Sequence, residues 1–147
     1  MKLHHISMYS WDFYFCMCAD DTREVIAAHE EEFGEGSGDY LSENVNITSN
    51  GRANMRGDLR VSVITINVDS LHERDSSIEY AQSVIAHEAC HVANHLSNRI
   101  GYNPVQSGDD EPFSYLVGDL MFEGLCEFKR YVKSKKYKFR SAAGTEA

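Results

Sequence analysis

Two histidines and a glutamate stand at a chemically useful spacing in the stretch Val84–Leu96, VIAHEACHVANHL. His87, Glu88 and His91 match the pattern H-E-x-x-H. Side chains four residues apart on a helix are neighbours on one face, so both imidazoles can reach one metal ion. The glutamate projects beside them, where it can take a proton from a water that the ion activates. The pattern therefore predicts a site for metal-assisted hydrolysis.

A catalytic zinc takes three protein ligands and leaves its fourth position open to water. Glu111 is the favoured third ligand, because it follows His91 by twenty residues and opens the next predicted helix. The rival carboxylates are Asp109, Asp110 and Asp119. Two imidazoles and one carboxylate favour Zn²⁺ among the common divalent ions.

The element that must position the motif is a helix predicted to begin at Ser76, with Glu79 completing a capping box. Its apolar residues form one stripe that can pack into a core: Ile78, Ala81, Ile85, Ala89, Val92 and Leu96. A second stripe, more than 100° away, carries Tyr80, Val84, His87, His91 and His95. His95 lies ~12 Å along the axis from His87 at 1.5 Å per residue, so we expect it to line a cleft rather than share the ion.

The remaining elements are predicted from local patterns. Ile6 to Cys18 and Leu59 to Val68 indicate strands, and the helix TREVIAAHEEEF is ended by Gly34. Asn50-Gly51 predicts a tight turn between short extended pieces. A third helix is predicted from Pro112; it is apolar almost all round and therefore expected to be largely buried, with Gly118 allowing close approach to the histidine helix.

Length and composition predict one α+β domain over residues 1–133, followed by a basic, flexible tail over residues 134–147. The domain would hold a small, mainly antiparallel sheet packed against the histidine helix and a second, buried C-terminal helix. Net charge is -15 from Met1 to Phe128 and +6 from Lys129 to Ala147, giving -9 in total. This acidic body argues against nucleic acid as the main ligand, apart from weak contact by the tail.

The compartment follows from what the sequence lacks. No apolar run approaches the ~18 residues of a membrane helix, which excludes a membrane partner, and the first residues do not resemble a signal peptide. The four cysteines form no C-x-x-C pair, as expected for reduced thiols. We therefore expect a cytoplasmic protein, and the sequence leaves its oligomeric state open.

Together these residues resemble the gluzincin branch of the zinc metallopeptidases, in which H-E-x-x-H is followed by a more distant glutamate. The strand LRVSVITINV is similar to the zincin edge strand that lies above the metal and pairs with extended substrate. The stretch HEACHVANHL…DDEPFSYLVGDL also resembles small bacteriophage-encoded proteins with a predicted metallopeptidase motif, whose compartment is the host cytoplasm. The resemblance covers roughly Val61 to Phe122.

The resemblance implies a compact zincin-like domain in which His87, His91 and Glu111 hold Zn²⁺ and Glu88 acts as general base and later proton donor. Tyr115 stands where thermolysin-like enzymes place an aspartate that orients a histidine, a role that Asp119 one turn later would have to take. Tyr115 and Tyr102 are the candidates for stabilising the oxyanion.

The sequence therefore predicts a zinc-dependent hydrolase, a small phage-type metallopeptidase that cleaves a peptide or amide bond in a peptide or protein substrate. The alternative is a non-catalytic, zinc-containing binding protein that attaches to a host or virion component. A weaker third hypothesis is an acidic mimic of nucleic acid, against which the basic tail argues.

Overall fold

The computed structural model describes residues 3–6, 11–103 and 110–141. It contains one four-stranded sheet in the order β1-β2-β4-β3. The strands are β1 (Leu3–Ile6), β2 (Trp11–Cys16), β3 (Gly51–Arg56) and β4 (Val61–Ile66). The outer pairings, β1 with β2 and β3 with β4, are antiparallel, whereas the central pairing of β2 with β4 is parallel. The predicted α+β class is confirmed, with a sheet that is mixed at its centre.

Strand β4 lies inside the sheet and is buried along its whole length. Val61 and Val63 face one core, and Ile64 and Ile66 face the other. A strand covered on both faces has no polar side, which is why its sequence is a nearly continuous β-branched run. The interpretation of LRVSVITINV as an edge strand was therefore wrong, because the edge beside it is β3.

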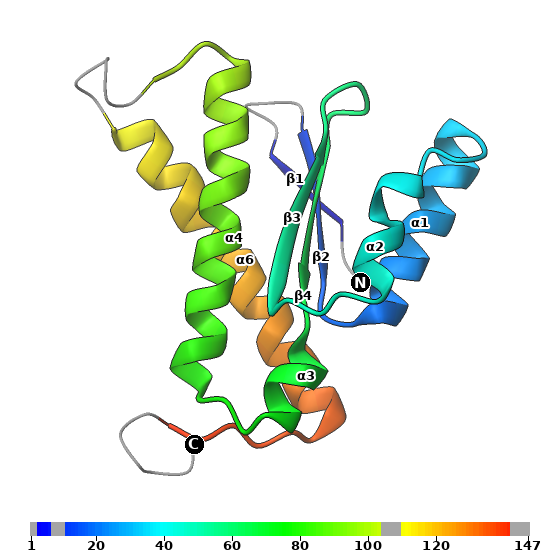
Figure 1. The fold of residues 1–147 in the computed structure, drawn as a ribbon. Helices are drawn as coiled ribbons and strands as arrows, with labels where there is room; N and C mark the ends of the chain where they lie inside the picture. Colours follow the sequence, from blue (N-terminus) through cyan, green and yellow to red (C-terminus); the bar gives the residue numbers. More distant parts are fainter. Residues whose placement is uncertain (1–2, 7–10, 104–109, 142–147) are drawn as a thin grey trace.

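Helices cover both faces of the sheet (Figure 1). On one face lie α1 (Ala19–Phe33), a short 3-10 turn η2 (Asp39–Leu41) and α2 (Ser42–Val45). On the other lie α4 (Ile78–Arg99) and α6 (Glu111–Lys135), with the short α3 (Val68–Glu73) near one end of the sheet. In Figure 1, α6 crosses behind α4, so each of the two helices shields part of the same sheet face.

The main core lies between the sheet, α4 and α6. It buries Phe13, Phe15 and Ile85 almost completely, and the apolar stripe predicted for the histidine helix is confirmed. A smaller core under α1 and η2 contains Val25 and Leu41. Burial of a large apolar side chain stabilises a fold by roughly 1.5–3 kcal/mol, so the main core fixes α4 firmly against the sheet.

Helix α4 begins at Ile78, and its N-cap is Ser77 rather than the predicted Ser76. The Ser77 hydroxyl accepts a hydrogen bond from the Tyr80 backbone N–H at 3.1 Å. The Asn50-Gly51 pair was predicted to form a tight turn, but Gly51 is the first residue of β3. The chain reverses instead between β3 and β4, where Arg60 adopts a left-handed conformation with φ of 53°.

Helix α6 begins at Glu111, with Pro112 in its first turn. Only one side of it is buried, and Tyr115 and Phe122 are 67% and 64% exposed. The expectation of a largely buried helix was therefore wrong. Apolar residues surround this helix, but only the side carrying Leu116 and Leu120 contacts the core.

The boundary predicted at residues 133/134 falls inside α6, which continues to Lys135. The segment that follows is packed, since Phe139 is 5% exposed and Tyr137 stacks on His72 with ring centroids 4.0 Å apart. The Ile78 backbone N–H donates to the Arg140 carbonyl at 2.8 Å, which ties the segment to the start of α4. Residues 134–141 thus belong to the domain, and the rest of the predicted tail lies outside the described residues.

None of the described helices combines the length and the apolar character that crossing a bilayer requires.

Candidate metal centre

His87 and His91 converge on the exposed side of α4. Their Nε2 atoms are 3.0 Å apart, and the two rings meet edge to face with centroids separated by 4.6 Å. Two imidazole nitrogens bound to one tetrahedral zinc at 2.0–2.1 Å would lie about 3.3–3.4 Å apart. The pair is therefore within a few tenths of an ångström of the spacing that a shared zinc ion requires.

The short distance between these two nitrogens also restricts which of them can carry a proton. A neutral imidazole carries one N–H donor and one acceptor, so the 3.0 Å contact between His87 and His91 needs one Nε2 protonated and the other not. A metal ion satisfies both lone pairs at once and lets both rings keep their protons on Nδ1. The donor set therefore fits a cation that takes imidazole ligands.

Glu88 lies on the flank of α4 that faces β3. The residue is only 6% exposed, and its carboxyl accepts a hydrogen bond from the Ala53 backbone N–H. Burial raises the pKa of Glu88, while the charges of His87 and His91 and the Ala53 hydrogen bond oppose that rise. A carboxyl with a raised pKa, held beside two imidazoles, is suited to accept and return a proton.

Strand β3 brings the edge of the sheet to this carboxyl. Backbone groups alternate along an antiparallel strand, and the Ala53 N–H points to Glu88 instead of β4. The backbone groups of Gly51 and Met55 share that outward side by the same two-residue period. No strand covers this side of β3 among the described residues, and the Ala53 N–H and the Gly51 carbonyl are bonded to Glu88 and Ser49.

Gly51 makes the close approach of β3 to α4 feasible. A β-carbon there would lie 2.8 Å from Cγ1 of Val84, a distance that real β-carbons essentially never show. Gly51 and Ala53 were not predicted as site residues, because Asn50-Gly51 is typical of a turn and the apolar alternation in GRANMR is weak. The alternation of small or apolar Ala53 and Met55 with polar neighbours is the signal that was present.

Glu111 and Tyr115 do not join the histidines. Both are exposed on the first turns of α6, and no cluster of three or more His, Cys, Asp or Glu side chains able to hold a metal occurs within residues 3–6, 11–103 and 110–141. Asp110 and Asp119, the rival ligands, belong to no such cluster either, whereas Asp109 lies outside the described residues. The structure therefore brings together His87, Glu88 and His91 and leaves the predicted third ligand apart from them.

The rotation of α6 explains this separation. Gly124, not Gly118, makes the close contact with α4, since a β-carbon at Gly124 would meet Cγ2 of Ile85 at 2.7 Å. A β-carbon at Gly118 would meet nothing within 4 Å, so its predicted packing role was wrong. Ile85 and His87 are two residues and thus about 200° apart around α4, so α6 contacts a different side of α4 from the histidines.

His95, predicted to line a cleft, is half-buried against the sheet. Its ring meets Trp11 edge to face with centroids 5.9 Å apart. Burial lowers the pKa of His95, and the nearby Arg99 charge lowers it further. His95 is thus held as a neutral, packed ring rather than as a metal ligand.

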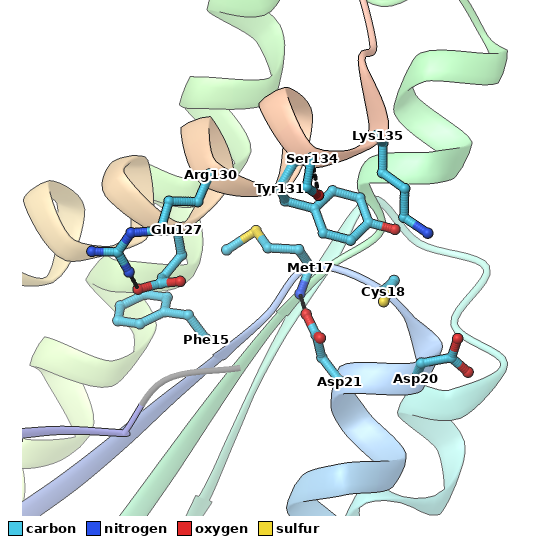
Figure 2. A pocket seen from close by; sticks show the side chains of 10 residues that line it. All are labelled: Phe15, Met17, Cys18, Asp20, Asp21, Glu127, Arg130, Tyr131, Ser134 and Lys135. Carbon is cyan, nitrogen blue, oxygen red and sulfur yellow. Dashed lines mark hydrogen bonds and ion pairs between the residues drawn. The ribbon is translucent and has the colours of Figure 1, made fainter.

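A cavity of about 580 Å³ lies elsewhere, between the carboxyl end of β2, the start of α1 and the last turns of α6 (Figure 2). Several of its polar groups already bond within the chain. Arg130 forms an ion pair with Glu127, and the Asp21 carboxylate accepts the Met17 backbone N–H at 2.7 Å. Tyr131 donates to Asp69 at 2.7 Å. The Tyr131–Asp69 bond joins α6 to α3, and the Asp21 bond fixes the start of α1 to the end of β2, so these polar groups of the cavity wall have structural roles.

Comparison of the chain with protein-family models, with curated proteins and with solved structures found no match in any of the three. The candidate site therefore rests on the geometry of its own residues.

Proposed function

We propose that this protein is a zinc-dependent hydrolase that cleaves a peptide or amide bond. The observation that carries the proposal is the 3.0 Å approach of His87 Nε2 to His91 Nε2 on an exposed helix face. The buried Glu88 carboxyl beside them and the edge strand β3 along the same flank support it. His87, Glu88 and His91 correspond to the H-E-x-x-H part of the gluzincin-type site that the sequence resembles, whereas the distant glutamate does not join them among the described residues.

In this proposal His87 and His91 hold the ion, which when bound polarises a carbonyl group and makes water more acidic. Glu88 accepts a proton from the attacking water and later returns it to the leaving amine. The Ala53 N–H keeps the Glu88 carboxyl oriented, and the outward backbone groups of β3 hold an extended substrate against the site. Glu111 was expected as the third ligand from its sequence spacing, but it lies apart from the histidines among the described residues, so the zinc measurements below assign that ligand.

Zinc content tests the first half of the proposal. Protein dialysed against Zn²⁺ and then against buffer should retain one equivalent, and His87→Ala and His91→Ala should each lose it. Asn94→Ala is the matched control, because Asn94 is exposed on the same helix. Glu111→Ala and Asp109→Ala, measured beside them, assign the third ligand to whichever variant loses zinc. Full retention of zinc by His87→Ala would overturn the metal assignment.

Turnover tests the second half. We expect parent protein loaded with zinc to cleave unfolded casein into peptides detectable by mass spectrometry, and Glu88→Gln to keep zinc but lose at least about 100-fold in rate. Gln preserves the size and one acceptor oxygen of Glu88 while removing its ability to take the proton. Equal rates for Glu88→Gln and parent would contradict the mechanism.

The second candidate function is a zinc-containing binding protein without catalysis. It is favoured by one observation, namely that only two imidazoles, and no third ligand, come together among the described residues. A binder would tolerate Glu88→Gln in a pull-down of its partner, whereas it would not tolerate loss of the zinc that His87 and His91 hold.

A further inference from the structure

The solvent side of α6 carries a stripe of residues with unusual symmetry. Its positions lie 4, 7 and 11 residues on either side of Phe122, the spacing of successive turns on one helix face. The members are Glu111, Tyr115, Gly118, Phe122, Cys126, Lys129 and Lys133. We call these residues the α6 stripe. On a helical wheel the stripe lies opposite Leu120 and Gly124, which contact the core.

The centre of the α6 stripe is apolar and open to solvent. Tyr115 is 67% exposed and Phe122 is 64% exposed, and they are the two most exposed large hydrophobic side chains among the described residues. Between them Gly118 leaves a flat surface, since a β-carbon there would meet nothing within 4 Å. Two large exposed rings on either side of a glycine are typical of a surface that a protein partner covers.

The ends of the α6 stripe carry opposite charges. Glu111 stands eleven residues before Phe122, and Lys133 stands eleven residues after it. A second copy of the same helix, running antiparallel with its two-fold axis at Phe122, would place each Glu111 opposite the partner's Lys133. It would also place each Tyr115 opposite Lys129, where an ammonium group over an aromatic ring is favourable. A parallel arrangement would instead bring Lys133 against Lys133 and Glu111 against Glu111.

We propose that a second copy of this chain docks on the α6 stripe, forming an antiparallel two-fold dimer. Phe122 packs against its own symmetry mate at the axis. Gly118 lies opposite Cys126, and this pairing of small side chains lets the two helices approach to the 8–10 Å of ordinary helix packing. The stripe spans about 33 Å at 1.5 Å per residue, so the contact runs along most of α6. An isologous contact of this kind closes on itself and stops at two copies.

The mass of the full chain in solution tests the proposal. Sedimentation equilibrium in the presence of EDTA, which removes any contribution from zinc, should give mainly dimer at about 100 µM, which requires a dissociation constant well below that concentration. Phe122→Glu should weaken dimerisation at least about tenfold, because it puts like charges at the centre of the contact. Phe33→Glu is the matched control, since Phe33 is an exposed aromatic ring on α1, 43% exposed. A monomeric parent, or a dimer that Phe122→Glu leaves unchanged, would overturn the proposal.

Two further variants test the register. Lys133→Glu should weaken the dimer, and adding Glu111→Lys in the same chain should restore it, by about two- to fivefold for each of the two symmetry-related pairs. Phe122→Cys, in a background with Cys90→Ser and Cys126→Ser, should form a disulfide-linked dimer on mild oxidation. Phe33→Cys in that background should stay largely uncrosslinked. Equal crosslinking of the two cysteine variants would mean random collision and would contradict the two-fold contact.

Discussion

The backbone of Gly51 on β3 lies so close to Glu88 on α4 that a β-carbon on the glycine would stand 3.0 Å from Cγ and 3.1 Å from Oε1 of the glutamate. This approach places the edge of the sheet directly against the carboxyl that we propose as general base. The position of Glu88 therefore depends on residue 51 having no side chain.

Gly51→Ala should therefore destabilise the protein. The added methyl group meets Val84 at 2.8 Å as well as Glu88, and relief requires movement of β3 or of the side chains on α4. Overpacking of this kind costs about 1–3 kcal/mol of unfolding free energy, measurable by urea denaturation. Gly57→Ala is the control, with an expected cost below about 1 kcal/mol, because the atoms it would meet belong to the far end of the long Arg99 side chain, which can shift, and not to backbone. A Gly51→Ala protein as stable as the parent would show that β3 does not press on α4.

Two glycines of α6 should respond in opposite directions to alanine. Gly124→Ala places a β-carbon 2.7 Å from Cγ2 of Ile85 and 3.0 Å from Cε1 of Phe15, so we expect a loss of about 1–3 kcal/mol. Gly118→Ala points into open space and gains helix propensity, so we expect a stabilisation of about 0.5–1 kcal/mol. Thermal unfolding of both variants, at a protein concentration low enough for the chain to be monomeric, gives the comparison. If the two shifts had the same sign, the rotation of α6 described above would be incorrect.

Stability should fall in mild acid because of His29. Its ring is fully buried against Tyr14, Phe33 and Tyr40, and burial, followed by the Arg56 charge, lowers its pKa. The unfolded chain therefore binds a proton at His29 more readily than the folded chain does. The stability that the neutral, buried ring contributes is complete above pH 6.5, the ordinary pKa of histidine, and is lost as the pH falls through the lowered pKa of the folded state.

The unfolding free energy, measured by urea denaturation between about pH 8 and about pH 5, tests this effect. His29→Gln is the control, since Gln is neutral at every pH and can still accept the Tyr40 hydroxyl. We expect the parent to lose more stability than the variant over this range. Parallel pH profiles would show that His29 is not the titrating group.

The cysteines should differ sharply in reactivity. Burial raises the pKa of Cys16 to about 12, so on the order of one thiol in ten thousand is ionised at about pH 8. Cys90 is exposed on α4. Iodoacetamide should therefore label Cys90 in the native protein and Cys16 only after unfolding, as peptide mass spectrometry would reveal. Native labelling of Cys16 at the rate of Cys90 would place its thiol outside the core.

The histidine helix was predictable because its evidence is local. The apolar stripe through Ile85 and Ala89 repeats at the helical period, and the i, i+4 spacing of His87 and His91 by itself makes their rings neighbours. The buried strand at Val61–Ile66 was predictable for the same reason, because a run of β-branched residues strongly favours a strand. Its place in the sheet was not, because strand order depends on contacts that a single strand does not encode.

The position of Glu111 relative to the histidines could not be predicted, because it depends on how a distant helix is rotated about its axis. The distance in sequence from His91 to Glu111 limits how far apart they can lie, but not the side of α4 that α6 contacts. That side is chosen where Gly124 meets Ile85, and Gly118 offers the same local signal as Gly124. Tyr115 and Phe122 likewise gave no sign in the sequence that they would face solvent.

The hydrogen bond from the Ile78 N–H to the Arg140 carbonyl links the start of the histidine helix to a residue that is translated much later. A nascent chain that ends before α6 has emerged would carry both histidines on a helix without its neighbour at Gly124 or this terminal partner. The two imidazoles are close in sequence and would meet early, whereas the anchoring of their helix would wait for the last part of the domain. Complete anchoring of the histidine helix is thus coupled to translation through residue 140.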